Sequence, residues 1–251
     1  MLASVYLLGA GRWEHMEEKA GVVYVSAEEM RRMDNVMIQE FHVDVLVLME
    51  NAGRATATLA KRMLQGTILG KRVGCLVGGG NNGGDGMVAA RHLANWGADV
   101  DVIVGTTKDR MKDAPLGQLR VLEKMGIPIL LGDYNLRGYD LLIDGLIGYG
   151  LEGNPRDRVA RMIKDANASG CPILALDLPS GMNSTTGESY NPCIKATATL
   201  TLALPKTAFL SQGASPYVGD LYLADISVPR KVYQSFGQQK ILFQEEHLLR
   251  I

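Results

Sequence analysis

Short apolar runs alternate with amphipathic segments through the middle of the chain. Strands that alternate with helices of about 12 residues are typical of βαβ units, so the pattern predicts an α/β fold with a mostly parallel sheet. The apolar runs predict strands at residues 73–77, 100–104, 127–131, 139–144 and 172–177, and the segments between them predict helices at 87–96, 113–125 and 155–169, the last capped by Asn154.

Two further helices are predicted before the first of these strands. Ser26 and Glu29 form an S-x-x-E capping box, and methionines recur at helical spacing behind it, which favours core packing. Asp44 can cap a second helix that runs to about residue 64, with Gly66 just beyond its end.

The chain is expected to form a single domain at residues 21–233. Strand-like segments at 196–203 and 221–226 complete it, and tails are expected at residues 1–20 and 234–251. The first tail is mildly apolar but lacks a basic segment, so it does not predict a signal peptide.

A glycine segment, Gly78 to Gly86 (Gly-Gly-Gly-Asn-Asn-Gly-Gly-Asp-Gly), separates the first strand from its helix. Glycine adopts positive φ and admits a ligand close to the backbone, and a helix N-terminus attracts anions, so the segment predicts a loop that holds phosphate. It contains G-x-G-x-x-G, but Asp99 and Asp101 stand at the beginning and interior of the second strand, where no ribose contact is made, and no Walker lysine follows. A glycine-rich turn without a ligand is the alternative.

Two aspartates, Asp144 and Asp177, end predicted buried strands. Because ligands of open parallel sheets bind beyond the carboxyl ends of the strands, we expect both carboxylates and the glycine segment to face one crevice. Two such carboxylates can divide their roles, one ionised beside a cation and the other exchanging protons. The alternative is that each aspartate only caps the turn that follows it.

Side-chain oxygens of Asn82, Asp144 and Ser180 are suited to a hard cation, and a single formal negative charge favours a monovalent ion. Lys206 follows another predicted strand. It is either a solvent-exposed lysine or a further group of the site.

Composition narrows the range of functions. The 251 residues carry a net charge of −1, which argues against a nucleic-acid or membrane-surface binder. Three cysteines without a C-x-x-C motif fit a reducing, cytoplasmic location. No apolar run approaches the roughly 18 residues that span a bilayer.

Several motifs occur together in a fixed order along the chain. They are Val25–Arg31, Met49–Gly53, Gly80–Gly86, the glycine-rich loop after Asp144, Asp177–Gly181 and Gly219–Ile226. In this order they resemble the NAD(P)H-hydrate epimerases, the YjeF N-terminal domain family. The resemblance covers about residues 23–229 and implies a Rossmann-like three-layer αβα fold with extra N-terminal helices.

The resemblance implies an isomerase that interconverts the R and S epimers of hydrated NADH and NADPH, usually as a homodimer. It implies one potassium ion (K+) per subunit, held by Asn82, Asp144 and Ser180. The implied substrate-binding residues are Asn81, Asn82, Gly83, Gly84, Asp85, Gly148, Tyr149, Gly150, Leu151, Glu152, Gly153, Asn154 and Asp177. Tyr149 departs from the small residue or threonine that is commoner in the family.

Related chains are often fused to a dehydratase domain that removes the hydrate. This sequence carries none, so the dehydratase is expected to be a separate protein. Inversion at a carbon bonded to both nitrogen and hydroxyl needs a group that gives and takes a proton. We expect Asp177 to be that group, assisted by Lys206.

Two other functions are considered. An NAD(P)-dependent dehydrogenase would explain the glycine segment, but such an enzyme usually has an acidic residue at the end of the second strand, and this sequence has none there. A non-catalytic dimeric scaffold of the same fold could lose Asp177 or the Asn-Asn-Gly-Gly-Asp-Gly motif, and both are present.

Overall fold

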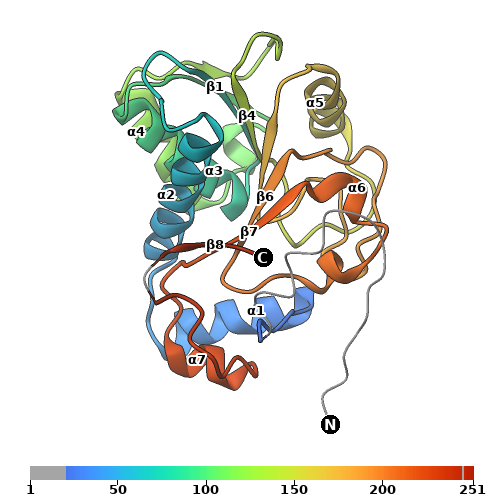
Figure 1. The fold of residues 1–251 in the computed structure, drawn as a ribbon. Helices are drawn as coiled ribbons and strands as arrows, with labels where there is room; N and C mark the ends of the chain where they lie inside the picture. The colour runs from blue at the N-terminus through green and yellow to red at the C-terminus, as the bar shows by residue number, and fades with distance from the viewer. Residues whose placement is uncertain (1–20, 245) are drawn as a thin grey trace.

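The computed structural model describes residues 21–244 and 246–251, so the predicted tail at residues 1–20 lies outside it. The described residues form one eight-stranded sheet in the order β3-β2-β1-β4-β5-β6-β7-β8 (Figure 1). All neighbouring strands are parallel except β7 and β8, which confirms the predicted α/β class. The strands are β1 (Arg72–Val77), β2 (Asp99–Val104), β3 (Ile129–Leu130), β4 (Leu141–Gly145), β5 (Ile173–Leu176), β6 (Ala198–Leu202), β7 (Asp220–Ala224) and β8 (Leu248–Arg250).

Helices cover both faces of the sheet. Helices α2 (Val45–Met63), α3 (Asn81–Asn95) and α4 (Asp113–Lys124) lie on one face, and α5 (Asp157–Ala168) lies on the other (Figure 1). Side chains alternate between the two faces of a strand, so β1 contributes residues to the hydrophobic core on each face of the sheet. Cys75 and Val77 pack in the core that contains α2 to α4, whereas Leu76 packs with Met162 and Ile163 of α5.

Both predicted N-terminal helices are present. Helix α1 (Ala27–Asn35) begins with the predicted capping box of Ser26 and Glu29 and continues into the π-helical turn η2 (Val36–Glu40). Asp44 caps α2 by accepting a hydrogen bond from the Leu46 amide at 2.7 Å. These starts depend on local hydrogen bonds, which explains why the sequence predicts them well.

Two predicted helix starts are wrong. Helix α3 begins at Asn81 rather than residue 87, so most of the glycine segment is helical. Helix α5 begins at Asp157, because the Asn154 amide oxygen accepts a hydrogen bond from the Asn191 backbone at 2.9 Å instead of capping the helix.

The end of the chain is attached to the sheet, contrary to the tail expected at residues 234–251. Strand β8 pairs antiparallel with β7, and Leu248 and Ile251 are buried. The remaining short elements are η3 (Lys108–Arg110), η4 (Thr207–Leu210), α6 (Ser215–Val218) and α7 (Arg230–Ser235).

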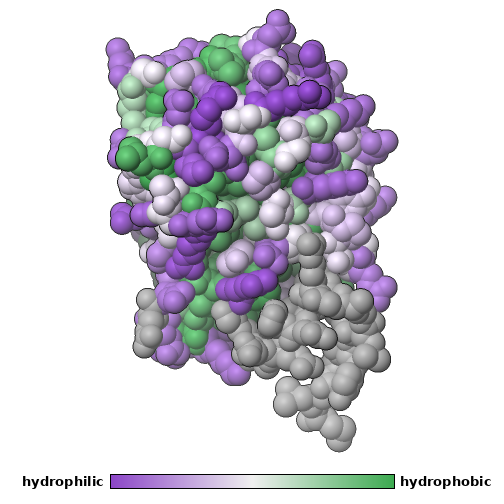
Figure 2. Space-filling view, turned by 45° about the horizontal axis from the view of Figure 1, so that its top comes forward, coloured by the Kyte–Doolittle hydropathy of each residue, from purple (hydrophilic) through white to green (hydrophobic). Residues whose placement is uncertain are grey.

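Hydrophilic residues break up the apolar patches on the face shown in Figure 2. Among the described residues, no helix is both long and apolar enough to cross a membrane.

Candidate active site

The glycine segment packs against the protein rather than forming an open loop. Its glycines are not among the residues with positive φ in the described chain. A Cβ at Gly83 would lie 2.0 Å from the carbonyl oxygen of Gly78, and one at Gly78 would lie 2.0 Å from that of Leu146. A Cβ at Gly84 would meet the Met49 side chain at 2.5 Å. The glycines therefore let α3 start directly against β1, β4 and α2, and positive φ is not the reason for them.

A cleft of about 720 Å³ opens at the carboxyl edge of the sheet. Helices α1 and α2, the start of α3 and the loop after β4 surround it. Of the predicted substrate-binding residues, those that line it are Asn81, Asn82, Asp85, Gly148, Tyr149, Gly150 and Asp177.

The other predicted contacts lie elsewhere. Gly83 and Gly84 face neighbouring backbone and Met49. Within the described residues, the segment Leu151 to Asn154 is not part of the cleft lining, and both Glu152 and Asn154 are exposed to solvent.

Asp177 and Lys206 form a buried ion pair in the cleft, with side chains 5% and 1% exposed. The ammonium group of Lys206 also donates to Thr201 Oγ1 at 3.3 Å and to the Leu202 carbonyl at 3.1 Å. Asp177 has a φ of 67°, a left-handed conformation that aspartate tolerates better than most residues. The solvent-exposed alternative for Lys206 is therefore wrong, because its charge is held against a carboxylate.

Asp144 is completely buried and, contrary to the prediction, is not among the described residues that line the cleft. Uncharged donors hold its carboxylate. Its carboxylate accepts hydrogen bonds from the Ser180 amide at 2.8 Å, the Ser180 hydroxyl at 2.6 Å and the Leu146 amide at 3.2 Å. Burial raises the pKa of Asp144 to about 6, although these hydrogen bonds favour the charged form.

Asn82 reaches the same loop from α3. A Cβ at Gly148 would lie 3.3 Å from Cγ of Asn82, so the two residues are in close contact. The side-chain nitrogen Nδ2 of Asn82 is buried and has no hydrogen-bond partner among the described residues. Such a group calls for an explanation, because buried polar atoms are almost always paired.

Asp34 is a cleft residue that the sequence analysis missed. Its carboxylate accepts a hydrogen bond from the Tyr149 hydroxyl at 2.6 Å, which links α1 to the loop after β4. Burial raises the pKa of Asp34. A signal was present, because Asp34 stands one helical turn from Met30, on the face that carries the methionines.

Asp85 adds a third carboxyl group to the cleft. Burial, together with the nearby charges of Asp177 and Asp34, raises the pKa of Asp85 well above its usual value. The cleft therefore combines one carboxylate paired with an ammonium group and one carboxyl that favours its neutral form. This is a combination suited to proton transfer.

Comparisons with known proteins agree with these features. The family described as "YjeF-related protein N-terminus" matches residues 45–208. The chain is 35% identical to an NAD(P)H-hydrate epimerase of Rhodopirellula baltica, covering 85% of this chain and 88% of the relative. It is 37% identical to one of Lentilactobacillus buchneri, covering 82% and 95%.

The chain is also similar to a longer relative and to a solved structure. The chain is 36% identical to the bifunctional NAD(P)H-hydrate repair enzyme Nnr of Moorella thermoacetica and spans 41% of its length, with 83% of this chain covered. The crystal structure of the yeast protein ynu0 has a TM-score of 0.80 at 23% identity, covers 92% of this chain and all of its own, and has the same fold. The chain therefore belongs to the family of YjeF-related protein N-terminal domains, as the sequence motifs indicated.

Proposed function

We propose that this protein is an NAD(P)H-hydrate epimerase, an isomerase that interconverts the R and S epimers of hydrated NADH and NADPH. Relatives of this name cover most of the chain. The observation that carries the proposal is the buried pair of Asp177 and Lys206, which lies in a cleft large enough for part of a dinucleotide.

Asp177 is proposed as the group that exchanges the proton. The ring nitrogen of the hydrate can expel the hydroxyl once that hydroxyl is protonated, and water can then add to the opposite face. The departing hydroxyl leaves as water with a proton that the Lys206 ammonium passes on through the Asp177 carboxylate, and the incoming water returns a proton by the same route, so the enzyme ends unchanged. Lys206 holds the Asp177 carboxylate in place, as its three contacts suggest.

The N-terminus of α3 is proposed to hold the pyrophosphate. Gly80 is the N-cap and provides no side-chain hydrogen bond, so the first N–H groups of the helix remain available for an anion. Gly80 and Asn81 both line the cleft, which supports this orientation of the substrate.

A potassium ion is proposed at Asn82, Asp144 and Ser180. The side chains of Asp144 and Ser180 are in direct contact, and Asn82 approaches the same loop with a buried amide whose nitrogen lacks a partner. Reversing that amide would direct its oxygen to the unpaired position. One carboxylate among neutral oxygens fits a monovalent ion, which would balance the buried charge of Asp144.

We further propose a homodimer that works with an NAD(P)H-hydrate dehydratase. The name of the bifunctional relative supports the pairing of these activities. A reducing, cytoplasmic location is consistent with the free thiols of Cys75, Cys171 and Cys193.

The direct test starts from one purified epimer of NADPH hydrate. Chromatography that separates the two epimers should show equilibration much faster than the spontaneous rate. No acceleration at any enzyme concentration would overturn the proposal and favour the scaffold alternative. In water enriched in heavy oxygen, uptake of label indicates loss of the hydroxyl, whereas epimerisation without label indicates ring opening.

A further inference from the structure

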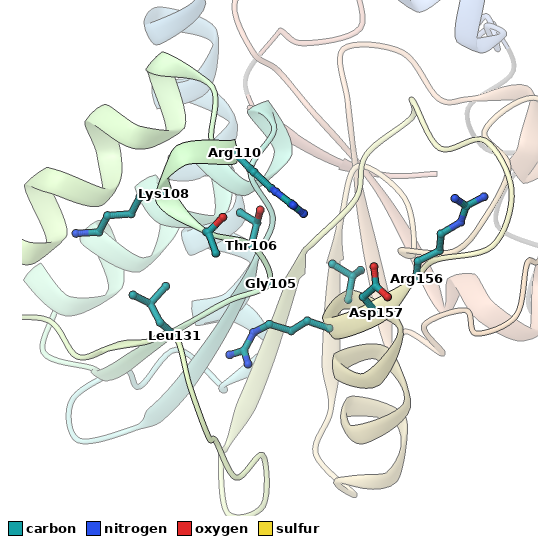
Figure 3. A pocket seen from close by; sticks show the side chains of 10 residues that line it. Gly105, Thr106, Lys108, Arg110, Leu131, Arg156 and Asp157 are labelled. Carbon is teal, nitrogen blue, oxygen red and sulfur yellow. The ribbon is translucent and has the colours of Figure 1, made fainter.

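A second cavity, of about 430 Å³, lies at the carboxyl end of β2, next to the start of α5 (Figure 3). Four of its lining residues are cationic and one is acidic. The lining consists of Gly105, Thr106, Thr107, Lys108, Arg110, Leu131, Arg156, Asp157, Arg158 and Val159. We call it the basic pocket.

The cationic side chains of the basic pocket differ in the ion pairs and hydrogen bonds that they make with other residues of the protein. Lys108 turns away from the cavity and pairs with Glu123. Arg158 donates from Nε to the Val104 carbonyl at 2.7 Å, which fixes it at the wall. The guanidinium of Arg110 instead extends into the space beside Thr106 (Figure 3), and no ion pair joins it to any described residue. Arg156, the fourth cation, also has no ion pair with any described residue, but its side chain lies across the cavity and extends away from Thr106 (Figure 3). Arg110 is therefore the cation best placed to meet an anionic ligand beside Thr106.

The basic pocket adjoins the cleft through the glycine segment. A Cβ at Gly79 would lie 3.0 Å from both the Arg110 carbonyl oxygen and Thr106 Cγ2, so the loop after β2 touches this segment directly. The next residue, Gly80, lines the cleft, as does Lys112 at the end of the loop. A ligand that crosses the start of α3 would therefore extend from one cavity towards the other.

The sheet sets the length of such a ligand. The order β2-β1-β4-β5 places three strand spacings between the basic pocket and Asp177, about 14 Å. In doubly wound folds a dinucleotide crosses this edge, with its pyrophosphate at the first helix and its adenosine ribose at the end of the second strand.

The end of β2 indicates which ribose would fit. An acidic residue at this place binds a free 2′-hydroxyl, whereas an arginine nearby accommodates a 2′-phosphate. Here β2 ends at Val104 and continues into Gly105 and Thr106, with no carboxylate. Asp109 lies in the following turn, where it accepts a hydrogen bond from the Thr107 side chain. Asp157 across the cavity is the acidic lining residue.

We propose that the basic pocket binds the adenosine end of the substrate and that Arg110, with Thr106, recognises a phosphate on the ribose 2′-oxygen. This rests on the proposed function and makes the hydrate of NADPH the preferred substrate over that of NADH. Arginine suits the role because its planar fork donates two hydrogen bonds to a phosphate.

A binding experiment tests the pocket without turnover. Calorimetry should find adenosine 2′,5′-bisphosphate bound at least tenfold more tightly than adenosine 5′-monophosphate. Arg110→Ala should remove this preference, and Arg110→Glu should reverse it. Arg161→Ala is the matched control, because Arg161 is an exposed arginine of α5 that pairs with Asp165. Equal affinity of the two nucleotides, or a preference that survives Arg110→Ala, would overturn the proposal.

Kinetics provide the second readout. The ratio of kcat/KM for NADPH hydrate to that for NADH hydrate should fall at least tenfold in Arg110→Ala through KM, with kcat unchanged. An unchanged ratio contradicts the role of Arg110. If the nucleotide preference is found but neither hydrate is epimerised, the proposed binding role of the basic pocket is supported and the proposed epimerase activity is contradicted. Failure of the one proposal can therefore be told apart from failure of the other.

Discussion

Asp144 and Asp177 are similar in sequence and differ in their surroundings. Each lies at the end of a buried strand, β4 or β5, and each is itself buried. Asp144 accepts hydrogen bonds from backbone amides and a hydroxyl, whereas Asp177 faces the ammonium group of Lys206 and has a left-handed backbone. The comparison teaches that a carboxylate's partners, and not its position at a strand end, decide whether it supports the structure or exchanges protons.

The largest expected effect concerns Asp177. In Asp177→Asn, kcat for epimerisation should fall by about 10²–10⁴, because an amide cannot exchange the proton. Asparagine tolerates positive φ, so the backbone at this position should be kept. The measurement is kcat by epimer-resolving chromatography, with Asp99→Asn, an exposed carboxylate at the start of β2, as the control. Near-normal turnover would remove the distinction between the two aspartates.

A substitution at Lys206 should show how much the ion pair with Asp177 contributes to the stability of the protein. Lys206→Met leaves a buried carboxylate without its counter-charge, which should lower the free energy of unfolding by about 3–5 kcal/mol. Denaturant titration measures the loss. The double variant Asp177→Asn/Lys206→Met should be more stable than the sum of the two single effects predicts. Strict additivity would mean that the pair does not interact as described.

Asp144 should behave as a carboxylate that supports the structure and holds the proposed potassium ion, and not as the group that exchanges the proton. In Asp144→Asn an NH2 group replaces one acceptor among the donors of Ser180 and Leu146, so the free energy of unfolding should fall by about 2–3 kcal/mol. Ser180→Ala removes only the hydroxyl and should cost about 1 kcal/mol. Both are measured by denaturant titration. An Asp144→Asn protein of normal stability that loses turnover as Asp177→Asn does would refute the division of roles.

Asp85 extends the comparison to a carboxyl whose charged form is disfavoured. The pKa of the Asp85 carboxyl in the folded protein is raised above its usual value of 3.8. The stability that the protonated carboxyl contributes is therefore complete below about pH 3.8, and it is lost as the pH rises through the pKa of the folded state. Relative to the wild type, Asp85→Asn should therefore gain stability between pH 4 and pH 8, by about 1.4 kcal/mol for each unit by which the pKa is raised.

Denaturant titrations at the two pH values test this prediction for Asp85. In Asp99→Asn the exposed carboxylate should produce no comparable pH-dependent gain. A difference between wild type and Asp85→Asn that stays constant with pH would show that Asp85 ionises normally in the folded protein.

The predicted helices and strands were confirmed where they depend on residues close together in the sequence. The capping contacts of Ser26 and Asp44, and the apolar runs that became β1, β2, β4 and β5, depend on neighbouring residues and on side-chain period. The sequence also indicated that Asp144, Asp177 and the start of α3 share one edge, because parallel strands present their carboxyl ends together.

Contacts between distant residues decided the rest. The glycines after β1 are required by the closeness of Gly78 and Leu146 and not by positive φ, and no local pattern distinguishes these reasons. Strand β8 has too few residues to stand out, and it forms only because β7 offers it an edge. The sequence by itself determined the elements and most of the reactive groups. Only the tertiary structure determined that Lys206 meets Asp177 and that Asp34 reaches the cleft, because packing sets those distances.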